Sequence, residues 1–244
     1  MRGGPQSRMI AARIRATGAA MDTEGPSTGR TLLASHPLFA GLDEQALTQL
    51  SRFLHVREVR KGAAIVRKGD PGASLMIVAD GAVKVVAPSA DGKEALLNVI
   101  ERGGVFGEIA LLDGEPRTAD AIALADCTLL VLDRRDVLPF IHRHPQVAIE
   151  FISVLCRKLR QASEHVESMM FLSVTARMAR ALQRFRQGTS VPLTQLQIAQ
   201  AIGSTRESVN QELRRWQAEG WIRLEKGGLV ILRDDMLDEL ARAR

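Results

Sequence analysis

A regular run of apolar residues after Pro145 constrains this chain more than any other feature of its sequence. The apolar positions alternate four and three residues apart, which is a heptad repeat and keeps one narrow apolar stripe along an α-helix. Charged residues such as Arg157 and Glu164 avoid the stripe. The spacing predicts a helix over 145–171, about 40 Å long at about 1.5 Å per residue. The stripe consists of Ala148, Ile152, Leu155, Leu159, Ala162, Val166 and Met169.

Such a stripe has two structural interpretations. A long helix can pack along its own domain, or two copies of the helix can pair as a symmetric coiled coil. The stripe is narrow and regular, which favours the coiled coil, because a helix packed on a globular domain has a broader apolar face. We therefore expect a homodimer that is joined through residues 145–171.

Residues 55–135 have a different pattern, in which short β-type runs alternate with turns. The turns are marked by Gly, Pro and Asp, as in KGDPG and DGEP. Six or more short strands at this spacing predict a sandwich or a barrel. The runs are AAIV, SLMIVA, AVKVVA, ALLNVI, DAIALA and CTLLVL.

The C-terminal part of the chain has the spacing of a helix-turn-helix. Thr194 is followed three residues later by Gln197, and Ser204 by Glu207, and both pairs match the capping box that opens a helix. Gly203 lies between the two predicted helices and can adopt the positive φ of a tight turn. After them, WIRLEKGGLVIL predicts a β-hairpin wing and DDMLDELARA predicts a final helix.

Charge and composition exclude several classes of protein. The net charge is +5, and residues 174–244 carry 12 Lys and Arg against 8 acidic residues, which favours a polyanionic partner there. There is no stretch of about 18 apolar residues, so we expect no membrane span. Cys127 and Cys156 lie far apart and match no metal-ligand spacing, which favours a reducing, cytoplasmic location and no metal site.

Residues 1–30 are rich in Gly, Ser, Arg and Ala and have little periodic pattern. This composition predicts a disordered N-terminal extension. The extension lacks the apolar core of a secretory signal, and Met21 offers a second candidate start.

The segment FGEIALLDGEPRTA, residues 106–119, combines groups that suit a sugar phosphate. Gly107 permits a close backbone approach, and EIALL can form one helical turn whose free N–H groups attract an anion. Arg117 offers a charged fork that suits a phosphate, and Glu108 offers an acceptor that suits a hydroxyl. A surface ion pair between Glu108 and Arg117 is the alternative that spacing alone leaves open.

This segment closely resembles the phosphate-binding cassette of cyclic-nucleotide-binding domains. The resemblance implies an eight-stranded β-roll in which Glu108 accepts the ribose 2′-hydroxyl and Arg117 pairs with the cyclic phosphate. It also implies that backbone N–H groups near Ile109 and Ala110, and the hydroxyl of Thr118, complete the cradle. The residues that match the cassette are Phe106, Gly107, Glu108, Ile109, Ala110, Leu111, Arg117, Thr118 and Ala119.

From about residue 32 to residue 233 the chain resembles the cyclic-AMP receptor protein/FNR family of bacterial transcription regulators. The cassette, the heptad helix and IGSTRESVNQELRRWQAEGWIRL occur in the order of that family. The resemblance implies an α+β chain with a β-roll (jelly-roll) cyclic-nucleotide-binding domain over 31–143. A dimerisation helix over 144–172 and a winged helix-turn-helix domain over 173–244 follow. It implies a ligand-responsive regulator, not an enzyme, that binds a palindromic operator and contacts RNA polymerase.

The identity of the nucleotide depends on few positions. In cyclic-AMP-binding members of the family, a Thr-Ser pair on the long helix contacts the adenine amino group across the dimer, and the matching residues here are Ala162 and Ser163. A Thr after the cassette Arg, as at Thr118, also occurs in cyclic-GMP-binding domains. We favour cyclic AMP as the effector, with cyclic GMP as the alternative.

The signal could also be something different from a cyclic nucleotide. A redox or gas sensor of the same architecture would need haem or an iron–sulfur cluster, and two distant cysteines cannot form a Cys₄ site. A regulator that works without any ligand is a further interpretation, and the pairing of Glu108 with Arg117 speaks against it.

The second helix of the motif, expected to start at Ser204, has an apolar face and a polar face. The apolar face is expected to pack on the domain core. Its members are Val209, Leu213 and Trp216, with Leu196 and Ile202 as expected neighbours.

The polar face of this helix is the predicted DNA-reading surface. The resemblance places Arg206 on a guanine and Glu207 on a cytosine amino group, which is the chemistry expected of those side chains. Gln211 stands where the family has a second base-reading Arg, with Asn210 beside it. Arg214 suits a phosphate contact, which adds affinity without sequence choice.

Overall fold

A computed structural model of the chain describes residues 25–39 and 41–242. For residues 1–24, the predicted disorder lies outside the described residues. From residue 25 onward that prediction is wrong, because helix α2 (Gly25–Ser35) begins there. Leu33 of this helix is fully buried in an apolar core that it shares with strands of the first domain. This burial stabilises α2 although the sequence around it is rich in Gly and Ser.

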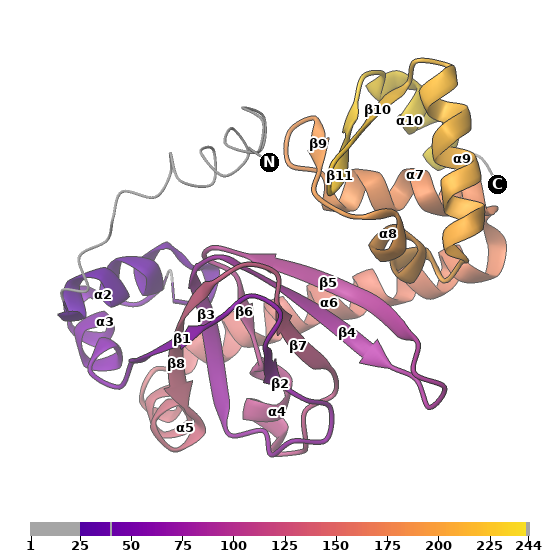
Figure 1. The fold of residues 1–244 in the computed structure, drawn as a ribbon. Coiled ribbons are helices and arrows are strands. Elements are labelled where there is room, and N and C mark those ends of the chain that lie inside the picture. The colour runs from indigo at the N-terminus through magenta and orange to yellow at the C-terminus, as the bar shows by residue number, and fades with distance from the viewer. Residues whose placement is uncertain (1–24, 40, 243–244) are drawn as a thin grey trace, which may run out of the picture.

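Eight strands fold into a β-roll of two antiparallel four-stranded sheets, which confirms the predicted α+β class. One sheet has the order β1-β8-β3-β6 and the other β2-β7-β4-β5, as Figure 1 shows. Val78, Val83 and Leu129 are fully buried in the apolar core of the roll. The strands are β1 (His55–Val59), β2 (Ala64–Val66), β3 (Ser74–Asp80), β4 (Ala82–Pro88), β5 (Glu94–Glu101), β6 (Val105–Phe106), β7 (Asp120–Ala123) and β8 (Cys127–Asp133).

All six runs predicted as strands form strands, and the structure adds β1 and β6. β1 lies at the edge of its sheet and its first four residues are exposed, so its sequence has no apolar alternation. β6 has only two residues. Both strands form because a partner elsewhere in the chain pairs with them, β8 with β1 and β3 with β6.

Helices cover the outer face of the β1-β8-β3-β6 sheet. Side chains alternate along a strand. On β3, Leu75 and Ile77 therefore pack against the helices, while Met76 and Val78 pack inside the roll. Phe140 is fully buried on the helical side. The covering elements are α2, the 3₁₀-helix η1 (Pro37–Phe39), α3 (Glu44–Ser51), α5 (Arg134–Arg143) and the start of α6 (Pro145–Phe171).

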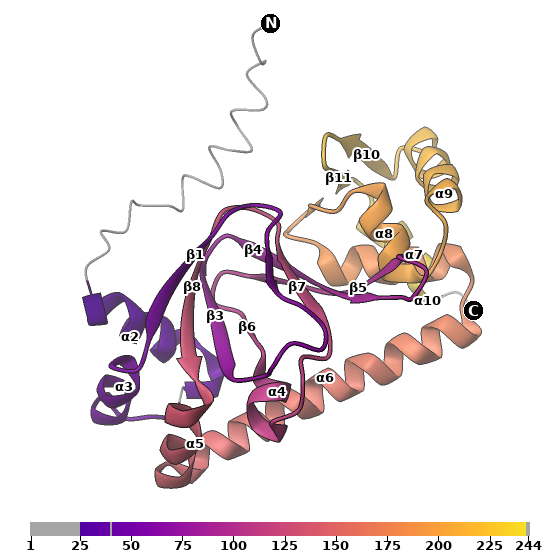
Figure 2. The same cartoon turned by 60° about the horizontal axis from the view of Figure 1, so that its bottom comes forward.

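Helix α6 has the bounds predicted from the heptad repeat, and it runs from the roll to the C-terminal domain in Figure 2. Near its start, Val147 and Phe151 are buried against the first domain. The heptad stripe lies on another face, where Ile152 is 55% and Leu159 is 67% exposed. Val166 and Met169 of the stripe are exposed as well, so one copy of the chain leaves apolar side chains on this face uncovered.

The C-terminal domain is a winged helix-turn-helix. Thr194 and Gln197 form the predicted capping box of the first motif helix, and Gly203 after that helix has a φ of +59°. The predicted wing forms as β10 and β11, with β9 paired at its edge. The elements are α7 (Val174–Phe185), β9 (Ser190–Val191), α8 (Gln195–Ile202), α9 (Arg206–Ala218), β10 (Ile222–Glu225), β11 (Gly228–Ile231) and α10 (Asp234–Arg242).

The start of the second motif helix differs from the prediction. Thr205, not Ser204, caps α9, and its Oγ1 accepts a hydrogen bond from the N–H of Ser208 at 3.2 Å. The N–H of Ser204 donates to the carbonyl of Ala199 at 3.0 Å, so Ser204 belongs to the end of α8. The predicted capping box of Ser204 with Glu207 is therefore wrong.

The apolar face of α9 packs as predicted, with Val209, Leu213 and Trp216 fully buried. Ile202 is buried in the same core. Leu196 is instead 52% exposed, because it lies outside the buried face of α8.

The winged helix-turn-helix also contacts the roll directly. Val86 of β4 and Leu96 of β5 are buried in the same apolar cluster as the core of this domain. Gln200 of α8 donates to Glu94 of β5 at 3.4 Å. The two domains are therefore connected through β5 as well as through α6.

Candidate nucleotide-binding and DNA-binding sites

The predicted cassette lies between β6 and β7, around a short helix, α4 (Glu108–Asp113). Gly107 directly precedes α4 and has a φ of +86°, in the left-handed region. A Cβ at this position would lie 2.8 Å from the carbonyl oxygen of Ser74 and would collide with Arg117. Glycine is therefore required for the close backbone approach that the sequence predicts.

Arg117 is held by three hydrogen bonds, and none of them uses its Nε. Its Nη1 donates to the carbonyl of Gly107 at 3.1 Å, and its Nη2 donates to the carbonyl and the hydroxyl of Ser74 at 2.9 and 3.0 Å. The residue is only 6% exposed, and its Nε is buried without a hydrogen-bond partner among the residues that the structure describes. Burial lowers the pKa of Arg117, and the carboxylates of Glu108 and Asp70 oppose that shift. A buried guanidinium with an unpaired donor suits an anion such as a phosphate.

The backbone of Arg117 is fixed by the turn between β2 and β3. The N–H of Gly69 donates to the carbonyl of Arg117, and the N–H of Arg117 donates to the carbonyl of Asp70, both at 2.8 Å. Asp120 is buried and accepts from the N–H of Lys68 at 2.7 Å, which anchors the same turn. A segment far earlier in the sequence thus sets the position of the cassette arginine.

Glu108 is the second buried charged residue of the cassette, with only 2% of its surface exposed. Its Oε1 accepts from the Nζ of Lys158 on α6 at 2.5 Å. This ion pair joins the cassette to the long helix. The heptad pattern marks Lys158 only as a polar position off the stripe, so the sequence alone does not reveal this contact.

The cassette, β4, β5 and α6 surround a cavity of about 560 Å³, a size typical of small-molecule sites. Ala162 lines it, but Ser163 does not line the cavity of its own chain. The predicted contact of Ser163 with a ligand across the dimer stays a prediction. The predicted ligand residues that line the cavity are Gly107, Glu108, Ile109, Ala110, Arg117 and Thr118.

Four further polar residues line the cavity, and no sequence motif points to them. They come from three separate elements, β5, α6 and α7. Each occupies a polar position of its strand or helix. In the sequence such a position looks the same whether the side chain faces a cavity or the solvent. They are Asn98, Gln161, His165 and Arg184.

The second candidate site is the polar face of α9. Ser204 and Asn210 are half-buried, and the other predicted DNA-binding residues are exposed. Arg215, beside them, forms an ion pair with Glu212 at 2.7 Å. An exposed polar face on the second helix of this motif can enter a DNA major groove. The exposed residues are Arg206, Glu207, Gln211 and Arg214.

Two negative observations apply to residues 25–39 and 41–242. No three His, Cys, Asp or Glu side chains in these ranges are grouped so that they could hold a metal ion. Within the same ranges, no helix is both long and apolar enough to cross a membrane. Cys127 is buried and Cys156 is exposed, and both thiols are free.

The cassette and the winged helix-turn-helix together define the class of this protein, a DNA-binding transcription regulator that binds a cyclic nucleotide. Residues 56–144 match the cyclic nucleotide-binding domain family, and residues 176–240 match the Crp-like helix-turn-helix domain family. The chain belongs to the CRP/FNR family of transcription regulators.

Relatives of this chain include two regulators that are named for cyclic AMP. The CRP-like cAMP-activated global transcriptional regulator of Mycobacterium tuberculosis is 31% identical over 221 residues, which cover 86% of this chain and 99% of that protein. The cyclic AMP receptor protein of Thermus thermophilus is 34% identical over 209 residues, which cover 84% of this chain and 96% of that protein. The Mycobacterium tuberculosis relative is named as a transcriptional regulator.

The fold is also shared with solved structures. The c-di-GMP responsive global regulator CLP of Xanthomonas campestris matches with a TM-score of 0.68 and 22% identity. The match covers 78% of this chain and 99% of that one, and at this identity it shows the fold alone.

Proposed function

We propose that this regulator is controlled by cyclic AMP, which binds between the cassette and α6. The observation that carries the proposal is the buried Nε of Arg117, which has no hydrogen-bond partner in the described part of the chain and belongs to a residue that lines a nucleotide-sized cavity. The two cyclic-AMP-named relatives support adenine over guanine as the base. Cyclic GMP is the second candidate, because Thr118 lines the cavity and has a counterpart in cyclic-GMP-binding domains.

We further propose that two copies of the chain pair through residues 145–171. The exposed stripe on α6 supports this pairing, since a second copy would remove its apolar side chains from water. A two-fold dimer requires a palindromic operator with half-sites about one helical turn, or about 10–10.5 bp, apart. Contact with RNA polymerase is part of the proposal and is inferred from family membership.

The proposed switch acts through α6, because the cavity lies between this helix and the roll. A ligand hydroxyl at Glu108 would meet the carboxylate that Lys158 now holds, so binding alters a contact between the cassette and the long helix. Moving a two-state equilibrium from 1:99 to 99:1 requires about 5.5 kcal/mol of differential binding. Two sites per dimer would each supply about 2.7 kcal/mol, which one or two charge-assisted hydrogen bonds can provide.

Calorimetric titration of the purified protein with cyclic AMP and with cyclic GMP, separately, tests the effector. We expect saturable binding of both nucleotides, with the lower Kd for cyclic AMP. A lower Kd for cyclic GMP would reverse the assignment of the base. Absence of binding by either would contradict a cyclic-nucleotide effector.

Replacement of Glu207 by alanine tests how α9 reads DNA. Glu207 is proposed to accept from a cytosine amino group, so Glu207→Ala should lose about 1–3 kcal/mol of discrimination at one base-pair position in each half-site. Selection of binding sites from random DNA, with wild type and with the variant, measures this loss at every position. Arg214→Ala is the matched control, because loss of a phosphate contact should weaken all sequences alike. A wild-type pool without a palindrome, or identical pools from wild type and Glu207→Ala, would contradict the proposed reading.

A further inference from the structure

The wall of the nucleotide cavity includes one side chain from the DNA-binding domain, Arg184 of α7. The cassette residues Arg117 and Thr118 line the same cavity from the roll. A cyclic nucleotide whose phosphate pairs with Arg117 must place its purine elsewhere in this space. The polar side chains that remain for the purine are those of α6, β5 and α7, and Arg184 is the one that comes from the DNA-binding domain.

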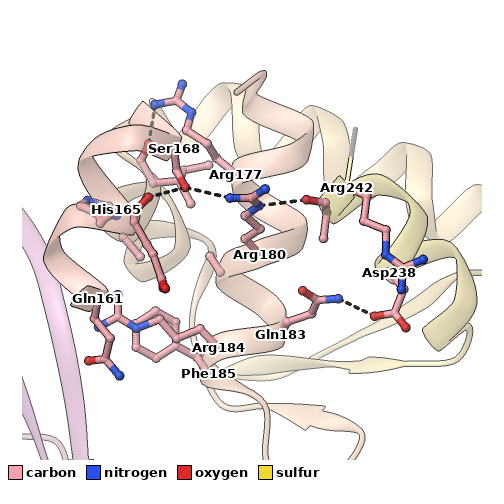
Figure 3. Close-up of a pocket in the computed structure, with 15 residues that line it drawn as sticks. Gln161, His165, Ser168, Arg177, Arg180, Gln183, Arg184, Phe185, Asp238 and Arg242 are labelled. Atoms are coloured by element: carbon pink, nitrogen blue, oxygen red, sulfur yellow. Dashed lines mark hydrogen bonds between the residues drawn. The ribbon is translucent and has the colours of Figure 1, made fainter. Parts of the chain in front are cut away.

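Arg184 is held in a defined place while most of its donors stay available. Its Nη2 donates to the carbonyl of Leu97 on β5 at 2.8 Å, which is the single hydrogen bond that it makes among the described residues. Its Cζ lies 5.0 Å from the centre of the Phe185 ring. Figure 3 draws a neighbouring pocket, between α6, α7 and α10, whose lining includes Arg184 and Phe185 together with Gln161 and His165 of α6. Arg184 thus lines the cavity while Nη1 and Nε make no hydrogen bond within the described part of the chain.

His165 of α6 lines the same cavity as Arg184. Burial lowers the pKa of His165, and the positive charges of Arg184 and Arg177 lower it further. His165 is therefore kept neutral beside the guanidinium, so Arg184 supplies the fixed positive charge at this end. A guanidinium only donates hydrogen bonds, so the base that suits it must present acceptors.

The two purines differ in this respect. Guanine presents two neighbouring acceptors, O6 and N7, whereas adenine presents the acceptor N7 beside the amino donor N6. We propose that Arg184 is a specificity-determining residue that donates to the O6 and N7 edge of guanine and so opposes the preference for cyclic AMP. The inference rests on the proposed function, because it requires that the cavity bind a cyclic nucleotide.

The placement of Arg184 also has a consequence for regulation. Because Arg184 belongs to α7, a nucleotide that uses it gains affinity only while the DNA-binding domain is docked on β5. By thermodynamic linkage, the factor by which docking raises the affinity for such a nucleotide is also the factor by which the bound nucleotide raises the docking equilibrium constant. The identity of the base would thus influence the position of the DNA-binding domain directly.

Calorimetry with both cyclic nucleotides on the full-length chain tests the assignment. Arg184→Ala should raise the Kd for cyclic GMP about tenfold and the Kd for cyclic AMP less than about threefold, since only guanine loses a bidentate partner. Arg184→Gln should shift the preference further towards cyclic AMP, because a glutamine amide pairs with the N6 and N7 edge of adenine. Arg180→Ala is the matched control: it removes the same charge from the same helix, but Arg180 bonds Ala241 and Ser168 and does not line this cavity.

The ratio of the two Kd values separates base reading from a structural role. If Arg184→Ala merely loosens the contact with Leu97, both Kd values change by the same factor, and the proposal is overturned. Unchanged Kd values overturn it as well. Wild-type protein that binds neither nucleotide would instead refute the proposed function, on which this inference rests. An unchanged ratio in Arg180→Ala, together with the shifted ratios at position 184, supports the proposal.

Discussion

Arg117→Ala is expected to weaken cyclic-nucleotide binding by about tenfold to about 150-fold. Removal of a charge-assisted hydrogen bond to a phosphate costs about 1.5–3 kcal/mol, and each 1.4 kcal/mol is about a factor of ten in Kd. The lost group is the buried guanidinium whose Nε has no hydrogen-bond partner among residues 25–39 and 41–242. Calorimetric titration of wild type and variant measures the change, and binding of equal strength in the two proteins would remove Arg117 from the site.

The same substitution also removes hydrogen bonds that hold the cassette. A control must therefore separate the loss of the phosphate contact from a loosened cassette. Arg117 donates to the carbonyls of Gly107 and Ser74, and loss of these bonds can loosen α4. Arg134→Ala is a matched control, since Arg134 donates to the carbonyl of Leu111 in α4 at 2.7 Å but does not line the cavity. We expect Arg134→Ala to lower the Tm while it changes the Kd much less than Arg117→Ala does.

A second large effect is expected at the dimer stripe. Leu159→Asp should convert the dimer into monomers and should abolish operator binding. Leu159 lies in the middle of the heptad stripe, so pairing of the two stripes would bury two carboxylates in an apolar contact. If burial of the carboxylates weakens the free energy of dimerisation by about 3 kcal/mol, the dimer Kd rises more than about a hundredfold. Sedimentation velocity at micromolar concentration measures the oligomeric state directly.

The neighbouring residue supplies the control for this experiment. Arg160 is exposed and follows Leu159 directly, but it lies off the stripe. Arg160→Asp adds the same carboxylate one position away and should leave the dimer intact. A stable Leu159→Asp dimer, with unchanged helicity by circular dichroism, would show that the chains pair through another surface.

The local elements of this protein could be predicted from the sequence because their signals are local. The heptad repeat defines α6, and its bounds depend only on spacing within the helix itself. The capping box of Thr194 and Gln197 and the left-handed Gly203 fix α8 and the turn after it through contacts a few residues apart. The cassette motif likewise identifies Gly107, Glu108 and Arg117, because its residues lie within one short segment.

The prediction fails where two local signals compete or where burial elsewhere decides. Both Ser204 and Thr205 can cap a helix, and the choice follows from the bond of Ser204 to Ala199, which closes α8. Helix α2 forms in a stretch that composition describes as disordered, because the core beneath the roll accepts Leu33. Leu196 has the apolar character of a core residue, yet the docking of α8 leaves it exposed.

The contacts that complete the nucleotide cavity were decided only by the tertiary structure. Ser74 lies 43 residues from Arg117, Lys158 lies 50 residues from Glu108, and Leu97 lies 87 residues from Arg184. Periodicity, caps and motifs report on neighbours along one element, and none of them encodes which separate elements meet. The sequence by itself therefore determined the long helix, the helices of the C-terminal motif, most strands of the roll and the cassette segment. The packing of α6 and α7 against the roll decided which charges line the cavity, because only that packing brings residues so far apart in the chain within hydrogen-bond distance.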